Sequence, residues 1–277
     1  MDFQQAVNYL LSLGRELAAP TQASSAKFNL ENISVLARHL GHPENKYPSV
    51  HIAGTNGKGS TAAFLEAILR EAGYRTGLYT SPHLERINER MRVEGNDIPD
   101  EAFADVFSRI HALIEKLLAD GTLRAHPTFF ECVTAMAFLY FAEAGVDFAV
   151  FETGLGGRLD STNIVTPQVS IITRIDFDHE NFLGHSLHEI AAEKAGIIKP
   201  TVPVVIAEQR DEVRQAIAAR TAVLHSPLVE PATLFSVESL RLEEGRVRAV
   251  VREPGGGKSM NIDPLLAGRF QLQNALN

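Results

Sequence analysis

The sequence lacks the features of secreted, membrane-spanning and nucleic-acid-binding proteins. Its 277 residues include one cysteine, Cys132, so a disulfide framework within the chain is excluded and we expect a buried thiol in an apolar helix. The N-terminus has no basic region before a long apolar run, and no apolar stretch is long enough to span a bilayer. No basic run is present and the formal net charge is -8, which argues against nucleic acid or an anionic membrane as partner. We therefore expect a cytoplasmic protein.

The composition is that of an ordinary globular protein. Its length of 277 residues suffices for one large domain or two smaller ones. Hydrophobic residues make up 45% of the chain, enough for a sizeable core, and charged residues make up 22%. Short apolar runs alternate with amphipathic stretches, which predicts an α/β fold with a mostly parallel sheet flanked by helices. The expected strands are 49–53, 76–80, 146–152, 169–173 and 202–207, and the expected helices are 59–72, 99–118, 128–144 and 186–194.

The pattern changes near residue 234. From there to about residue 263, short alternating segments are separated by glycine-containing turns, which predicts a small antiparallel sheet. Residues 271–277 resemble the start of a helix that is cut off, so a fragment boundary is an alternative to a natural terminus.

A glycine-rich loop lies where the first expected strand turns into a helix. Glycines let backbone amides approach phosphate oxygens, and the helix N-terminus adds its positive end. Lys58 can reach the outer phosphates, and the Ser60 hydroxyl can touch Mg²⁺ or a phosphate. The spacing departs from the common GxxxxGKS/T loop, and the alternative is a βα turn with a solvated lysine. The strand–loop–helix context favours ATP binding by Gly54, Thr55, Asn56, Gly57, Lys58, Gly59 and Ser60.

Two further groups of charged residues are expected near this loop. Glu152 ends an expected buried strand, and a carboxylate at that edge suits Mg²⁺ held against phosphates, although a helix cap or surface charge is the alternative. His179 lies in an acidic cluster after the next strand, where an Asp-rich turn is equally plausible. By pattern alone, Lys194 is a solvated lysine near a helix C-terminus.

Taken in order, these motifs resemble the folylpolyglutamate synthase/dihydrofolate synthase family of the Mur ligase superfamily. The resemblance extends over almost the whole chain, and the stretches Ser81–Leu84 and Gly154–Asp160 are its most specific parts. Its segments are 51–60, 80–84, 88–90, 151–163, 178–184 and 193–199.

The resemblance implies an ATP-dependent ligase. Such an enzyme joins L-glutamate to dihydropteroate, to the γ-carboxylate of a folylpolyglutamate, or to both, through an acyl phosphate. The implied cofactors are ATP and Mg²⁺, with two ions, and the implied partners are the small-molecule substrates: dihydropteroate or reduced folate, L-glutamate and ATP. We expect a monomer.

The resemblance also implies roles for individual residues. Lys58 would hold the β- and γ-phosphates, Ser81 and Glu152 would bind one Mg²⁺, and His179 would serve a second. Lys194 matches a lysine that is carbamylated in the family, and Asn274 matches a residue near the adenine. The catalytic set is then Lys58, His179 and Lys194, and the substrate-contacting residues are Thr128, Phe129, Phe130, Glu131, Leu159, Asp160 and Ser161.

The family pattern is not matched everywhere. Thr153 and Ser161 replace the usual valine and alanine, and Phe270 stands where a histidine is more frequent, so Phe270 is given no role. We expect residues 1–263 to form an ATP-binding Mur-ligase-like domain, and 264–277 to be a linker or the start of a C-terminal domain absent from this chain. Since that domain supplies glutamate-binding residues and part of the ATP site in the family, we expect 1–277 not to complete ligation alone.

Alternative functions are another Mur-type ligase acting on a peptidoglycan precursor and a P-loop nucleotide-binding module without ligase activity. The guanine-specific NKxD motif is missing, because Asn45-Lys46 is followed by Tyr47-Pro48. A degenerate partner protein that keeps only the fold is disfavoured by the intact Lys58, Glu152, His179 and Lys194.

Overall fold

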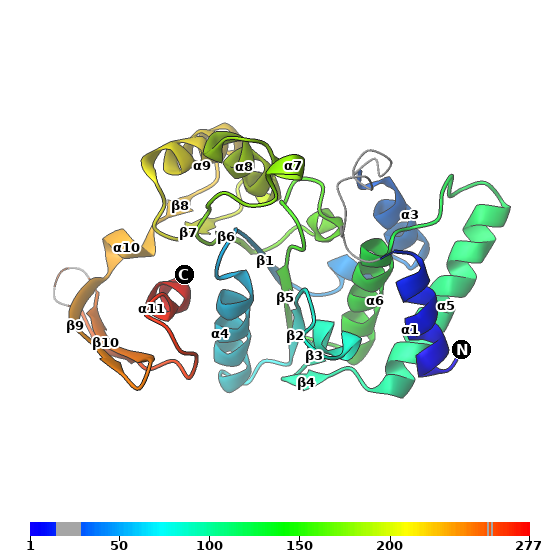
Figure 1. Cartoon of the computed structure of the whole chain (residues 1–277), viewed down its shortest axis with the longest axis horizontal. Coiled ribbons are helices and arrows are strands. Elements are labelled where there is room, and N and C mark those ends of the chain that lie inside the picture. The colour runs from blue at the N-terminus through cyan, green and yellow to red at the C-terminus, as the bar shows by residue number, and fades with distance from the viewer. Residues whose placement is uncertain (15–28, 254, 256) are drawn as a thin grey trace.

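A computed structural model describes residues 1–14, 29–253, 255 and 257–277. Its main feature is an eight-stranded sheet in the order β4-β3-β2-β5-β1-β6-β7-β8, in which the six strands from β2 to β8 run parallel (Figure 1). The strands are β1 (Ser49–Ala53), β2 (Thr76–Tyr79), β3 (Met91–Val93), β4 (Asn96–Asp97), β5 (Phe148–Glu152), β6 (Val169–Ile172), β7 (Val204–Ile206) and β8 (Leu228–Val229).

Helices cover both faces of this sheet (Figure 1). They include α1 (Phe3–Ser12), α3 (Glu31–His39), α4 (Lys58–Glu71), α5 (Asp100–Ala119), α6 (Phe129–Ala144), α7 (Glu180–Leu183), α8 (Leu187–Lys194), α9 (Asp211–Leu224), α10 (Pro231–Leu234) and α11 (Gln271–Leu276). Alternate residues of β5 show why the central strands are mostly apolar. Ala149 and Phe151 pack into the core shared with α6, whereas Val150 packs into the core beside α4. Central strands buried on both faces read as continuous apolar runs.

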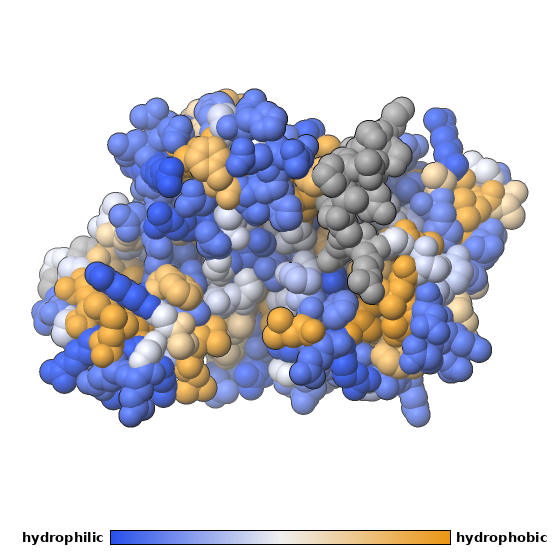
Figure 2. Space-filling model, in the orientation of Figure 1, coloured by the Kyte–Doolittle hydropathy of each residue, from blue (hydrophilic) through white to orange (hydrophobic). Residues whose placement is uncertain are grey.

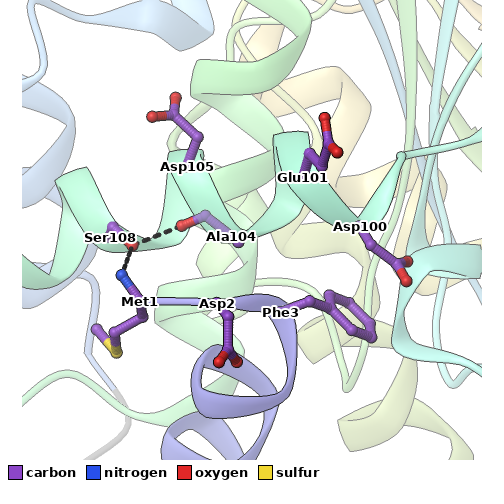
Figure 3. Close-up of a pocket in the computed structure, with 8 residues that line it drawn as sticks. All are labelled: Met1, Asp2, Phe3, Asp100, Glu101, Ala104, Asp105 and Ser108. Carbon is purple, nitrogen blue, oxygen red and sulfur yellow. Dashed lines mark hydrogen bonds between the residues drawn. The ribbon is translucent and has the colours of Figure 1, made fainter.

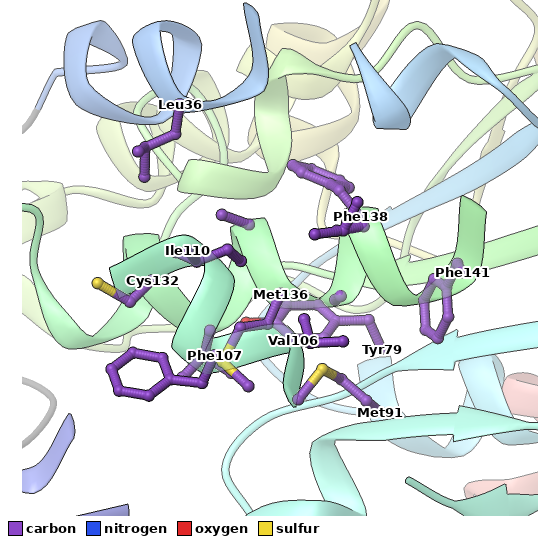
Figure 4. Close-up of a cluster of buried hydrophobic side chains, with 14 of the residues drawn as sticks. Leu36, Tyr79, Met91, Val106, Phe107, Ile110, Cys132, Met136, Phe138 and Phe141 are labelled. Carbon is purple, nitrogen blue, oxygen red and sulfur yellow. The ribbon is translucent and has the colours of Figure 1, made fainter. Parts of the chain in front are cut away.

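The largest core forms between α5, α6 and one face of the sheet. Figure 4 shows Phe107 and Ile110 of α5 beside Met136 of α6 and Tyr79 of β2. Helix α6 begins where predicted: the Thr128 hydroxyl accepts from the Glu131 amide, and the Glu131 carboxylate accepts from the Thr128 amide. Cys132 is fully buried in this core, and burial raises the pKa of its thiol, which agrees with the expected inert cysteine.

A small antiparallel sheet follows at the C-terminal end of the chain. It has the order β11-β10-β9, with strands β9 (Ser236–Glu243), β10 (Arg246–Arg252) and β11 (Ser259–Ile262). Val247, Ala249 and Val251 of β10 pack against Leu272 of α11, and α11 in turn lies beside α4 (Figure 1). Figure 2 shows hydrophobic residues gathered at this end of the molecule, and both Val237 of β9 and Phe270, directly before α11, are exposed.

The predicted fold class is confirmed: a mostly parallel α/β sheet with a small antiparallel sheet. The sequence analysis did not predict the edge strands β3, β4 and β8, or helices α1, α3 and α9. In the part of the chain that the structure describes, no helix combines the length and apolarity needed to cross a bilayer. The division at residue 263 stays a prediction.

Candidate active site

The predicted phosphate loop lies at the carboxyl end of β1, between β5 and β6. In an open parallel sheet this edge is where ligands bind. The loop is fixed from one side, because the amides of Thr55 and Asn56 both donate to the Arg174 carbonyl, at 3.0 and 3.1 Å. Those two amides are therefore occupied, and the phosphate-binding donors must be sought further along the loop.

Those donors are the amides of residues 57–60, at the start of α4. The first intrahelical bond there runs from the Thr61 amide to the Gly57 carbonyl, so the four preceding amides have no partner within the helix. The helix N-terminus places its positive end at the same point. This geometry suits a polyphosphate.

Two glycines make the loop possible. Gly57 caps α4 with φ +92°, in the left-handed region, and a Cβ there would lie 2.3 Å from the Asn274 Oδ1. A Cβ on Gly54 would lie 1.9 Å from the Thr173 Oγ1. Side chains at either position would displace a neighbour that shapes the loop.

Lys58 is folded over the loop and partly buried. Its Nζ donates to the carbonyls of Gly54 and Thr55, at 3.1 and 3.4 Å. The alternative of a solvated lysine in a βα turn is thereby disfavoured, because the ammonium is held over the loop that carries the free amides.

Glu152 ends β5 directly beside the phosphate loop. Only 4% of the residue is exposed, and its Oε2 accepts from the Ser81 amide at 3.2 Å. A Cβ on Gly59 would lie 3.5 Å from the same Oε2, so the carboxylate lies over the start of α4. Burial raises the pKa of Glu152 to about 7, against the opposing effect of the Lys58 ammonium. A buried carboxylate with one amide partner is a good ligand for a cation.

This donor set suits Mg²⁺ rather than a metal held by protein alone. The described residues contain no group of three or more His, Cys, Asp or Glu side chains that could hold an ion. Mg²⁺ is commonly bound by one or two carboxylates together with substrate phosphates and waters. Ser81 and Glu152 fit that pattern, because they lie together beside the free amides of the loop.

Lys194 lies beneath the loop and is not the solvated lysine that its sequence pattern alone predicts. It is 1% exposed, and its Nζ donates to the Gly54 carbonyl at 2.8 Å. Burial, with a smaller contribution from Lys58, lowers the pKa of its ammonium to about 7. The structure therefore brings Lys58, Glu152 and Lys194 to one edge of the sheet.

His179 is placed differently. It precedes α7 with φ +44°, its side chain is 53% exposed, and its Nε2 lies 3.4 Å from the Asp178 Oδ1. No hydrogen bond or ion pair within the described ranges joins it to Ser81 or Glu152.

The two predicted substrate segments meet each other at this edge. A Cβ on Gly154 would lie 2.6 Å from Cζ of Phe130, so the start of α6 packs on the glycine-rich loop. Beside Phe130, Phe129 is buried beneath the Arg90 guanidinium, which lies 5.3 Å from its ring centroid. Leu159 is partly exposed and Ser161 is buried.

The carboxylates of these segments already have partners. The Asp160 Oδ2 accepts from the amides of Gly154 and Leu155, at 2.8 and 3.0 Å, while Glu131 caps α6 together with Thr128. Both carboxylates therefore shape their own segments.

Asn274 lies against the phosphate loop although it is far away in sequence. Its carbonyl accepts from the Thr61 hydroxyl at 3.2 Å, and its Nδ2 donates to the Gln271 Oε1 at 2.9 Å. Its side chain is also the neighbour that a Cβ on Gly57 would meet.

Sequence reasoning missed the loop that supports the phosphate loop. The Arg174 carbonyl accepts from the amides of Thr55 and Asn56. The Gln209 side chain bonds to the residues on either side of Arg174, since its Oε1 accepts from the Ile175 amide and its Nε2 donates to the Thr173 carbonyl. The rule that ligand sites lie at strand carboxyl ends could have indicated residues after β6, but nothing in the sequence identifies Gln209.

A surface cavity of about 500 Å³ lies elsewhere, between α1 and α5 (Figure 3). Asp2, Asp100, Glu101 and Asp105 line it, which makes it unfavourable for a polyphosphate. The cavity is separate from the phosphate loop, since α1 and α5 lie at the opposite end of the molecule from α11 (Figure 1).

Comparison with known proteins agrees with this geometry. Residues 52–277 match the Mur ligase middle domain. The chain is 47% identical over 218 residues to a dihydrofolate synthase/folylpolyglutamate synthase of Bacillus subtilis, covering 77% of this chain and 50% of that protein. It is 36% identical over 242 residues to a folylpolyglutamate synthase of Lacticaseibacillus casei, covering 87% of this chain and 56% of that protein. The chain thus spans about half the length of the curated relatives it matches.

Solved structures show the same architecture. An FPGS–AMPPCP–folate complex superposes with a TM-score of 0.89 at 34% identity, covering 100% of this chain and 65% of that one. An FPGS–AMPPCP complex gives a TM-score of 0.90 at 33% identity with the same coverage. The family match over most of the chain and these similarities confirm the predicted resemblance, and the chain belongs to the Mur ligase family.

Proposed function

We propose that this chain is the ATP-binding part of a ligase that joins L-glutamate to dihydropteroate, to the γ-carboxylate of a folylpolyglutamate, or to both. The observation that carries the proposal is the meeting of free helix-start amides, the Lys58 ammonium and the buried Glu152 carboxylate at one sheet edge. The similarity to folylpolyglutamate synthases supports the choice of substrates.

In the proposed reaction, an oxygen of the acceptor carboxylate attacks the γ-phosphorus of ATP. The bond from that phosphorus to the β,γ-bridging oxygen breaks, and ADP leaves. The glutamate amine then attacks the acyl carbon, the phosphate leaves with the electron pair of the broken C–O bond, and the amine nitrogen gives up a proton to solvent. Both steps move negative charge onto phosphate oxygens, so positioned donors contribute more than a protein nucleophile would.

The candidate site residues are assigned the following roles in this reaction. The amides of residues 57–60 hold the β- and γ-phosphates, and Lys58 neutralises charge that develops on them. Ser81 and Glu152 would hold a Mg²⁺ ion, and His179 a second. When bound, such ions offset the charge of phosphate and acyl phosphate oxygens. Asn274 is proposed to lie near the adenine, since its helix packs on the phosphate loop.

Lys194 is proposed to carry a carbamate. The reaction needs an uncharged amine, and burial lowers the pKa of Lys194 to about 7, so a large share of the amine is neutral at physiological pH. Carbon-13 NMR in labelled bicarbonate at neutral pH tests this, because the amine takes up CO2 with release of a proton: one carbamate signal that Lys194→Met abolishes is expected, and no such signal in the wild type would contradict it.

The acceptor is proposed to lie along Thr128–Glu131 and Leu159–Ser161. Because the Glu131 and Asp160 carboxylates are engaged with backbone donors, these two residues would shape the pocket while the Phe130 ring and the Leu159 side chain supply its apolar surface. The proposed setting is a monomeric protein in the cytoplasm, in agreement with its single, buried cysteine.

Hydroxylamine trapping tests the first step without needing a glutamate site. The 277-residue chain is incubated with ATP, Mg²⁺ and hydroxylamine, which attacks an acyl phosphate in place of glutamate. We expect ADP and a hydroxamate in equal amounts with dihydropteroate, with tetrahydrofolate, or with both.

A UDP-muramyl peptide precursor serves as the competing acceptor. Product with that compound alone would show a peptidoglycan-type ligase. ATP binding without a hydroxamate from any acceptor would favour a nucleotide-binding module. Glutamate supplied in place of hydroxylamine should give no amide, because this chain is proposed to lack the glutamate-binding residues.

A further inference from the structure

One buried histidine in the central strand is not used by the proposed function. His51 is the third residue of β1 and is fully buried, with its Nε2 2.8 Å from the Thr162 Oγ1. That hydroxyl lies 2.5 Å from the Asp160 Oδ1. A chain of hydrogen bonds therefore runs from the strand that leads into the phosphate loop to the end of the glycine-rich loop.

The direction of each hydrogen bond follows from counting donors. The Asp160 carboxylate faces the amides of Gly154, Leu155 and Thr162, which can only donate. As a carboxylate it also takes the single hydroxyl proton of Thr162, so the hydroxyl can only accept from His51. His51 must then carry its proton on Nε2.

The surroundings of His51 agree with this assignment. Burial lowers the pKa of the imidazole to about 3, so the ring is neutral at pH 7 and has one N–H. Its Nδ1 is buried and has no partner among the described residues. With the reverse direction, the unpartnered Nδ1 would carry a buried N–H, and orphaned buried donors of that kind are rarer than orphaned acceptors.

The chain of bonds ends on a loop that links two parts of the site. Gly154 and Leu155, whose amides Asp160 holds, come two and three residues after Glu152. Further along, the Arg158 amide donates to the Glu193 carbonyl at 2.8 Å, next to Lys194. The position of the Asp160 carboxylate thus sets how this loop runs between the end of β5 and the end of α8.

We propose that His51 is a positioning residue which, through Thr162, orients the Asp160 carboxylate and so fixes the loop 154–160 that receives the acceptor. This inference rests on the proposed function for its substrate, but the hydrogen-bond chain itself does not. Loss of the chain should loosen the acceptor site while leaving the phosphate loop intact, because the free amides of residues 57–60 belong to α4 and not to this loop.

The test removes one bond at a time. Thr162→Val deletes the hydroxyl, and Thr162→Ser keeps it as a matched control. His51→Met deletes the donor, and His51→Gln restores an N–H at about the reach of Nε2. We expect the Val and Met variants to raise the KM for the acceptor in the hydroxylamine assay about tenfold, the loss expected when a buried hydrogen bond is broken. ATP affinity should stay within about twofold, and Ser and Gln should restore the KM.

Two measurements do not depend on catalysis. Nitrogen-15 NMR of the wild-type imidazole should show the Nε2-protonated tautomer, and the Nδ1-protonated form would overturn the assignment. Hydrogen exchange of the Gly154 and Leu155 amides should be faster in Thr162→Val than in Thr162→Ser, whereas equal rates would refute the positioning role. If wild-type protein forms no hydroxamate, the proposed function fails while the exchange result still decides this inference.

Discussion

The phosphate-loop edge of the large sheet and the small antiparallel sheet use charged residues in opposite ways. At the edge, Lys194 is 1% and Glu152 4% exposed, and neither forms an ion pair within the described ranges. In the small sheet, Arg248 and Arg252 lie on the surface and pair with Glu243 and Glu238, at 2.6 and 2.5 Å.

The difference indicates in which region the burial of charged groups lowers the free energy of unfolding. Burying a charge without a partner is unfavourable, so such groups persist where a ligand uses them. Exposed ion pairs cost little and contribute little. Substitutions of the buried charges at the sheet edge should therefore change ligand binding strongly, and substitutions of the exposed ion pairs in the small sheet should change neither binding nor stability by much.

The largest effect is expected from Lys58→Ala. Removing the ammonium deletes charge-assisted hydrogen bonds to the phosphates, so ATP affinity should fall about a hundredfold or more. Isothermal titration with an ATP analogue measures this, with Lys116→Ala on the exposed face of α5 as the matched control. If Lys58→Ala bound as tightly as Lys116→Ala, the phosphate assignment would be wrong.

Glu152→Gln should abolish Mg²⁺-dependent ADP formation. The amide keeps the shape and still can accept from the Ser81 amide, but it cannot supply the negative charge that a buried Mg²⁺ requires. Glu189→Gln is the control, since that exposed carboxylate caps α8. Unchanged turnover in Glu152→Gln would refute the metal assignment.

The pH dependence of stability should reveal Lys194. Its folded pKa of about 7 lies below the ordinary value of 10.5, so the unfolded chain binds the proton more tightly between those pH values. Wild-type stability relative to Lys194→Met should therefore rise between pH 7 and 10.5, by a few kcal/mol at most, at about 1.4 kcal/mol per pKa unit. Denaturant unfolding in buffer free of carbon dioxide measures it, and a constant difference across this window would show that folding does not lower the pKa of Lys194.

A smaller effect is expected from Gly57→Ala. Alanine at φ +92° costs about 1–2 kcal/mol, and its Cβ would displace the Asn274 side chain. ATP affinity should fall about tenfold, while Gly121→Ala, at φ +76° with open space around it, should show the strain without the loss of binding. If wild type and Gly57→Ala bound ATP with equal affinity, the turn at Gly57 would not be part of the nucleotide site.

Local patterns in the sequence predicted most of the fold. The capping boxes at Thr128 and Ser186 placed the starts of α6 and α8, because each signal lies within four residues. Strands β3 and β4 were missed because they are only 3 and 2 residues long and pair at an edge, where no apolar run is needed.

The candidate site was predicted less evenly. Lys58 could be identified because its neighbours form a contiguous motif, whereas Lys194 reads as a surface residue until folding places it under Gly54. Arg174 pairs with Thr55 of the phosphate loop, 174 − 55 = 119 positions away, and His51 pairs with Thr162, 111 positions away. Such contacts depend on strand order, which no local pattern contains.

The smallest effect is expected from the small sheet itself. Arg252→Ala removes a surface pair with Glu238, whose side chains are 43% and 35% exposed. Solvent screens such pairs, so the free energy of unfolding should change by no more than about 0.5 kcal/mol and ATP affinity should not change. Val251→Ala on the same strand provides the contrast, because its fully buried side chain packs against α11, which borders the phosphate loop. A loss of ATP binding in Arg252→Ala would mean that surface charge on this sheet acts on the nucleotide site, and the proposed division between the two regions would fail.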